Sequence, residues 1–248
     1  MANFPERYPA LFGRGAGFDI GDLRREYLSL REDAPSRTLR GKRYFVGHDG
    51  VPSARGYSNR REEHSAIALV NLQRDWEHPL GGSFRFLDYQ VPLKARQSDG
   101  GIGKIDLVGV DDKGRLILTE LKVESKHSGR GDSPFSALLQ GLRYAAIVEA
   151  NLAAIAREAK DFFGVEVRET APVVQLLATE EWWSQQGFNF SVAGNSQKYF
   201  AAFMDDIKRE IGITFEFLAF DHLNVDFGLD GGKPRLNPVP SLCPVPLR

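Results

Sequence analysis

The sequence has almost no cysteine and no long apolar segment. Its single cysteine, Cys243, excludes a disulfide within the chain, and such usage is typical of a reducing compartment. The first residues lack the apolar core of a secretory signal. The most apolar stretch, residues 137–156, is interrupted by charged and amide side chains, which argues against a membrane span. We therefore expect a cytoplasmic protein without a membrane partner.

Several familiar catalytic patterns are also missing. The five histidines do not have the spacing of a zinc site. No glycine-flanked serine indicates the nucleophile elbow of a Ser/His/Asp hydrolase. The glycine-rich run at residues 13–17 is not followed by Lys-Ser or Lys-Thr, so it does not predict a phosphate-binding loop.

The net charge is only −1, but basic residues are concentrated in one segment. From Arg37 to Arg61 there are seven lysines and arginines against one acidic residue, Asp49. Such a segment favours contact with a phosphate backbone, although a solvated surface without a partner is the alternative. A later polar loop adds further cations. The residues that we assign to nucleic-acid binding are Arg55, Arg60, Arg61, Lys126 and Arg130.

Three charged residues lie inside two apolar, strand-like stretches. Residues 103–110 and 115–123 flank a polar turn that ends in Gly114, as in many β-hairpins. Pairing around this turn places Asp106 opposite Glu120, about 5 Å away between Cβ atoms. Two facing carboxylates in a buried strand pair need a cation or a proton between them. The pattern therefore indicates a divalent metal; the alternative is a buried hairpin in which Glu120 and Lys122 form a surface pair.

Helices are expected on both sides of this hairpin in the sequence. The first runs from about residue 59 to 74, where Glu62 completes a capping box and Glu63 heads the face that should turn inward. The second begins at Ser133-Pro134 and extends to about residue 161. On this helix Gln140 shares a face with Tyr144, four residues later, although Gln140 has the alternative of facing solvent.

Asp106, followed after thirteen residues by Glu120-Leu121-Lys122, resembles the signature of the PD-(D/E)XK nuclease superfamily, with Ile105 in place of the proline. The helix–hairpin–helix order across residues 59–150 also matches that family. The resemblance implies a restriction-endonuclease-like core and a Mg²⁺ site, with Mn²⁺ as a plausible substitute. In it Lys122 would orient the attacking water and Gln140 would hold water or phosphate. The implied metal ligands are Asp106, Glu120, the carbonyl of Leu121, and Glu63, with Glu62 as the alternate to Glu63.

The order of the expected elements predicts an α/β fold with a central mixed sheet flanked by helices on both faces. Further strands are expected at residues 84–93, 172–179 and 214–220, and further helices at 20–31 and 196–210. Trp182 and Trp183, after the second of these strands, would either stack on bases or pack under a loop. The expected organisation is an N-terminal basic extension (1–57), a nuclease-like domain (58–227) and an irregular Gly/Pro-rich tail (228–248).

These patterns favour a Mg²⁺-dependent nuclease that hydrolyses phosphodiester bonds, with DNA as the expected substrate. One alternative is a nucleic-acid-binding or assembly module with the same fold and an inactive site. Another is a metal-dependent hydrolase of a different phosphoester. The sequence leaves open DNA or RNA, duplex or single strand, and whether two chains pair as a homodimer.

Overall fold

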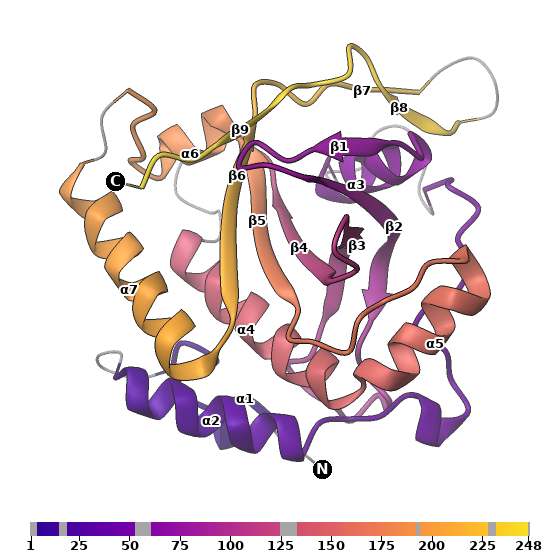
Figure 1. Cartoon of the computed structure of the whole chain (residues 1–248), viewed down its shortest axis with the longest axis vertical. Coiled ribbons are helices and arrows are strands. Elements are labelled where there is room, and N and C mark those ends of the chain that lie inside the picture. The colour runs from indigo at the N-terminus through magenta and orange to yellow at the C-terminus, as the bar shows by residue number, and fades with distance from the viewer. Residues whose placement is uncertain are drawn as a thin grey trace.

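A mixed β-sheet forms the centre of the molecule (Figure 1). The computed structural model describes residues 4–14, 19–52, 61–124, 133–191, 194–227 and 232–247. Within these residues the sheet has the strand order β1-β2-β3-β4-β5-β6-β9. The bounds are β1 (Asp75–Glu77), β2 (Ser83–Pro92), β3 (Lys104–Asp111), β4 (Leu116–Lys122), β5 (Val173–Thr179), β6 (Thr214–Phe220) and β9 (Leu242–Pro244). The first four strands are antiparallel neighbours, β4, β5 and β6 run parallel, and β9 is antiparallel to β6.

Helices cover both faces of this sheet, which confirms the expected α/β class with a large mixed sheet. The helices are α1 (Phe4–Arg7), α2 (Ile20–Glu32), the 3₁₀ turn η1 (Thr38–Arg40), α3 (Arg61–Asn71), α4 (Pro134–Ala150), α5 (Leu152–Phe163), α6 (Glu180–Gln185) and α7 (Asn195–Ile211). The larger core lies between the sheet and α2, α4, α5, α6 and α7. The smaller core lies under α3 and the ribbon of β7 (Val225–Phe227) and β8 (Pro234–Leu236).

Local signals explain the helix that follows the central hairpin. The Ser133 hydroxyl accepts a hydrogen bond from the Ser136 N–H at 3.1 Å, and Pro134 occupies the first turn, as expected. The single helix expected to residue 161 is instead divided at Asn151. The side-chain amide of Asn151 donates to the carbonyl of Ile147 at 2.8 Å, and α5 starts from the next residue. The helix is therefore interrupted because a side chain satisfies a carbonyl at its end.

The segment expected to be an N-terminal extension contributes to the larger core. Leu23, Tyr27 and Leu30 on α2 are fully buried there. Two cations of the basic segment bind backbone carbonyls: Arg37 donates to Arg43 and Lys94, and Lys42 donates to Ala95. These two cations hold the loop after α2 against the rest of the chain, so they are not a free phosphate-binding surface. Residues 42–46 of this loop form no helix or strand.

The C-terminal region also differs from its expected irregular form. Strand β9 extends the sheet beside β6, and β8 pairs with β7. Trp182 and Trp183 lie on α6, which the sequence did not indicate, and only 2% and 0% of these residues is exposed. The Trp183 indole donates to the carbonyl of Leu218 at 3.1 Å. Both tryptophans are therefore packing residues and are not available to stack on bases.

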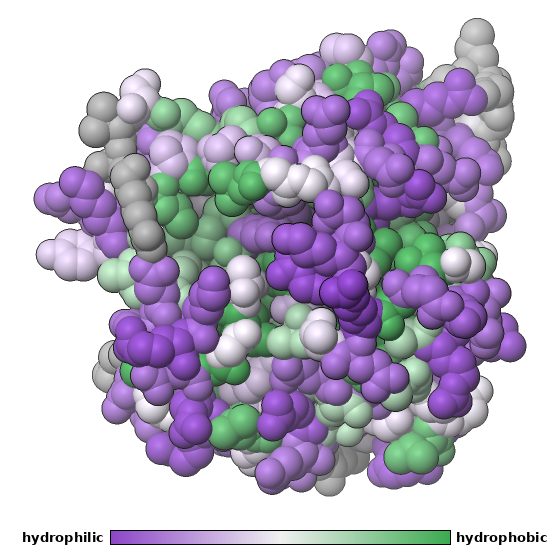
Figure 2. Space-filling view, in the orientation of Figure 1, coloured by the Kyte–Doolittle hydropathy of each residue, from purple (hydrophilic) through white to green (hydrophobic). Residues whose placement is uncertain are grey.

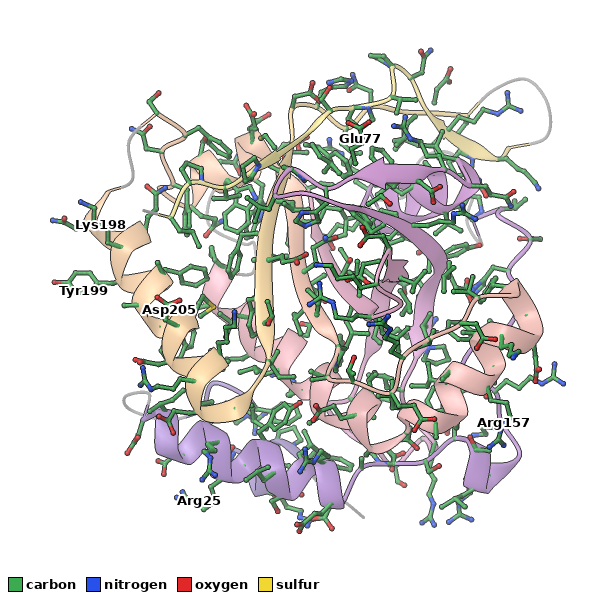
Figure 3. All side chains as sticks on the ribbon, viewed as in Figure 1. Arg25, Glu77, Arg157, Lys198, Tyr199 and Asp205 are labelled. Atoms are coloured by element: carbon green, nitrogen blue, oxygen red, sulfur yellow. The ribbon has the colours of Figure 1, made fainter. Side chains whose placement is uncertain are left out.

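Polar side chains dominate the face of the molecule shown in Figure 2, where apolar residues form small separate groups. Arg25, Arg157 and Lys198 point away from the sheet on the outer sides of α2, α5 and α7 (Figure 3). Among the described residues, no helix combines the length and the apolar character that crossing a membrane requires.

The burial of α2 gives a direct test of whether the N-terminal segment belongs to the core. We expect Leu23→Ala to lower the free energy of unfolding by about 2–5 kcal/mol, because it leaves a cavity in a packed core. Leu39→Ala is the matched control: Leu39 is 85% exposed, so the change should stay within about 0.5 kcal/mol. Urea unfolding measures both. Equal, small effects would show that the core does not depend on α2.

Candidate active site

The hairpin of β3 and β4 brings Asp106 and Glu120 together as the sequence predicts. Leu107 pairs with Thr119 and Val108 with Leu118, and just beyond the last pair the Asp106 carboxylate accepts a hydrogen bond from the Leu121 N–H, next to Glu120. The turn closes with Gly114 at φ +79°, a conformation that favours glycine. The turn and the apolar alternation thus fix which charged residues meet at the other end of the hairpin.

Glu120 is the most enclosed carboxylate of the site. It is 5% exposed, and one of its oxygens accepts a hydrogen bond from the Lys122 ammonium at 2.8 Å. The Gln140 amide nitrogen lies 2.8 Å from each carboxylate oxygen and 3.1 Å from the Tyr144 hydroxyl. Gln140 and Tyr144 therefore share a helix face that points at the site, and the solvent-facing alternative for Gln140 is wrong.

Asp106 is held between its two neighbouring strands. Its Oδ2 accepts from the backbone N–H of Leu121 on β4 at 3.0 Å. Its Oδ1 accepts from the side-chain amide of Gln90 on β2 at 2.9 Å. Both of these donors are uncharged amides, and together they fix the orientation of the carboxylate. Leu121 contacts Asp106 through its backbone N–H. The role of its carbonyl oxygen as a metal ligand stays a prediction.

The charges of these groups are strongly coupled. Burial raises the pKa of Glu120, the charge of Asp106 raises it further, and Lys122 only partly offsets this. Burial by itself would lower the pKa of Lys122, but the carboxylates of Glu120, Glu62 and Asp106 raise it overall, so the ammonium stays protonated. The carboxylates of Glu120, Glu62 and Asp106 thus all act on one ammonium group, and a divalent cation bound beside them would favour the ionised form of Glu120.

Helix α3 presents Glu62 to this cluster. The charge of Glu62 acts on both Glu120 and Lys122, whereas the charge of Glu63 acts on Tyr89 of β2. The packing of α3 does not separate the two residues, because Ala66, one turn after Glu62, and Ile67, one turn after Glu63, are both fully buried. Of the two glutamates, Glu62 is the one whose charge acts on Glu120 and Lys122.

Of the cations assigned to nucleic-acid binding, only Arg61 lies within the described residues. Its guanidinium forms an ion pair with the Glu124 carboxylate and donates to the Glu124 carbonyl at 3.0 Å. The other oxygen of Glu124 accepts from the Thr179 hydroxyl at 3.0 Å. Arg61 thus ties the start of α3 to the end of β4. Outside the described residues lie Arg55, Arg60, Lys126 and Arg130.

The fit of the site to a metal ion depends on two carboxylates. In the described part of the chain, no group of three or more histidine, cysteine, aspartate or glutamate side chains is arranged to hold a metal. Mg²⁺ usually binds through one or two carboxylates together with water and substrate phosphates. Asp106 and Glu120 supply that number of carboxylates.

Sequence reasoning missed the role of Gln90 and described Tyr144 only by its spacing from Gln140. The Tyr144 hydroxyl is buried beside the carboxylates, and burial followed by the charges of Glu120 and Asp106 raises its pKa. Gly103 leaves room for the Tyr144 hydroxyl, because a Cβ at position 103 would collide with that hydroxyl. The helix spacing was the available signal for Tyr144, whereas Gln90 had none beyond being polar in an apolar strand.

Comparisons with known proteins do not extend this description. No family model, no curated protein and no solved structure matches the chain. The residues and their geometry are therefore the whole basis for a function.

The coupled charges predict how the stability of the metal-free protein depends on pH. The pKa of Glu120 rises from an ordinary value of 4.5 to about 8 on folding. A raised pKa in the folded state gives stability that is complete below pH 4.5 and lost as the pH rises toward 8. In EDTA, we expect the free energy of unfolding to fall by at least about 1 kcal/mol between pH 6 and pH 8.5.

The pH dependence of the wild-type unfolding free energy is compared with that of two variants, measured in the same urea titrations. Glu120→Gln should remove most of this pH dependence, because the titrating group is gone. Glu169→Gln, an exposed position, should keep the wild-type curve. A wild-type stability that is flat or rises over this range would contradict the burial and repulsion described for Glu120.

Proposed function

We propose that this protein is a metal-dependent nuclease with a restriction-endonuclease-like core that hydrolyses phosphodiester bonds in DNA. The observation that carries the proposal is the cluster at the end of the β3–β4 hairpin. There Asp106 faces Glu120, and Lys122 and Gln140 both bind Glu120. Strongly shifted pKa values in a compact group of this kind are typical of functional sites.

The chain order supports the same core. Helix α3, the antiparallel strands β2, β3 and β4, helix α4 and the parallel strand β5 occur in this order along the chain, with β1 after α3 and α5 after α4. This agrees with the order that the PD-(D/E)XK resemblance implies. The charged cluster lies where β3 begins and β4 ends, and both flanking helices contribute a polar side chain, Glu62 and Gln140.

Each residue has a distinct part in the proposed reaction. A bound Mg²⁺ or Mn²⁺ would lower the pKa of a water molecule and neutralise charge on the scissile phosphate. Asp106 and Glu120, with Glu62 close by, would hold the ion. Lys122, which the carboxylates keep protonated, would stabilise the negative charge that develops on the phosphate. Gln140 fixes the orientation of Glu120.

One observation favours the alternative of an inactive binding or assembly module. Lys122 and Gln140 together supply hydrogen bonds to both oxygens of Glu120, so this carboxylate is satisfied inside the protein. Cleavage assays on plasmid, linear duplex, single-stranded DNA and RNA, with Mg²⁺ and with EDTA, separate the two functions. An inactive module would bind nucleic acid and leave every substrate intact.

Substitution of the three central residues tests the assignment of the site. Asp106→Asn, Glu120→Gln and Lys122→Ala should each lower the cleavage rate by at least about 100-fold, because each removes a charge that acts on the reacting phosphate or its metal. Lys113→Ala, an exposed lysine in the turn of the same hairpin, is the control and should cleave at the wild-type rate. A central variant that cleaves at nearly the wild-type rate would refute the site.

Metal binding provides a test that does not depend on cleavage. In titration calorimetry, Mn²⁺ should bind the wild type, and Asp106→Asn should weaken this binding at least about tenfold through loss of a ligand charge. Ca²⁺ should bind but support little cleavage, since its looser coordination positions water poorly. Activity that requires Zn²⁺ and does not respond to Mg²⁺ would contradict the proposed site.

A further inference from the structure

Gln90 has an unusual backbone conformation in the middle of a strand. Among the described residues, Gln73 and Gln90 are the two non-glycine residues with positive φ, at +46° and +49°. Residues with a long side chain seldom adopt this left-handed conformation, and it persists where the surrounding structure holds it. Gln73 follows the end of α3, where chain reversal is ordinary, whereas Gln90 lies inside β2.

The distortion at Gln90 changes which face of the sheet its neighbours cover. In a regular strand, residues two apart point to the same side. Here Tyr89 packs in the core under α3, and Val91 packs in the core under α4. Their partners on β3 are divided in the same way: Leu107 lies in the core under α3, and Ile105 lies in the core under α4. The irregularity is therefore centred on the pair of positions between them, Gln90 and Asp106.

The result is a hydrogen bond from the Gln90 amide to Asp106 at 2.9 Å. The Leu121 N–H binds the other oxygen of Asp106 at 3.0 Å, so β2 and β4 each supply one neutral donor. Two donors on different oxygens fix the orientation of the carboxylate. That arrangement is common around metal ligands, where the partners of the ligand set its direction.

We propose that Gln90 is a positioning residue, and that its left-handed backbone places the amide that orients Asp106 toward a divalent cation. This inference rests on the proposed function, because it requires Asp106 to be a metal ligand. It adds a residue on β2 to a site whose other members come from β3, β4, α3 and α4.

The test compares two glutamines that share a backbone conformation but not a location. Gln90→Ala removes the amide and retains the unfavourable backbone, whereas Gln90→Gly removes the amide and adopts positive φ easily. Gln73→Ala and Gln73→Gly are the matched controls, at an exposed position. Each full-length variant is titrated with Mn²⁺ alone, without nucleic acid, and its thermal unfolding is followed in EDTA to establish that it folds.

We expect both Gln90 variants to bind Mn²⁺ about 10–100-fold more weakly than the wild type, and both Gln73 variants to bind like the wild type. The melting temperature of Gln90→Gly should equal or exceed that of Gln90→Ala, because glycine relieves the backbone. In cleavage assays with saturating nucleic acid, kcat should fall about tenfold for the Gln90 variants, and KM for the nucleic acid should stay within about twofold.

Three results would overturn the inference, and they are distinguishable. Wild-type Mn²⁺ affinity in both Gln90 variants would show that the amide does not position Asp106. A loss in Gln90→Ala that is absent in Gln90→Gly would assign the effect to the backbone and refute the role of the amide. No Mn²⁺ binding by the wild type would refute the proposed metal site as well, which the first two results leave intact.

Discussion

The ion pair between Glu120 and Lys122 is the interaction on which the arrangement of the site depends. The two side chains meet at 2.8 Å and are almost completely removed from solvent. Burial of two charges costs several kcal/mol for each ion unless further hydrogen bonds complete the pair. Gln140 on α4 supplies such bonds, and Tyr144 binds Gln140 in turn. The position of α4 over β4 thus brings hydrogen-bond donors to this one buried carboxylate.

A buried ion pair retained for stability alone would have no further acidic groups beside it, whereas this pair has them. Asp106 lies beside Glu120, and the charge of Glu62 on α3 acts on both members of the pair. An apolar pair would be at least as stable in such a place, so this accumulation of acidic groups supports the proposed cation site.

Much of this arrangement was predictable from local patterns. The turn at Gly114 and the apolar alternation fix the hairpin register, and Ser133-Pro134 fixes the phase of α4, so Glu120, Lys122 and Gln140 meet as expected. The rest depends on contacts between distant segments. The choice between Glu62 and Glu63 depends on how α3 is rotated against the sheet, which the helix sequence does not specify. The left-handed Gln90, the burial of α2 and the pairing of β9 with β6 have no local signal in the sequence.

The most direct test of the central claim is the position of a bound ion. Crystals of the protein soaked in Mn²⁺ would give an anomalous difference map in which metal and protein atoms are clearly distinguished. The account predicts a single strong peak within coordination distance of one carboxylate oxygen of Asp106 and one of Glu120, and no such peak in Asp106→Asn. A peak elsewhere, with the two carboxylates unchanged and still held by Gln90, Lys122 and Gln140, would contradict it.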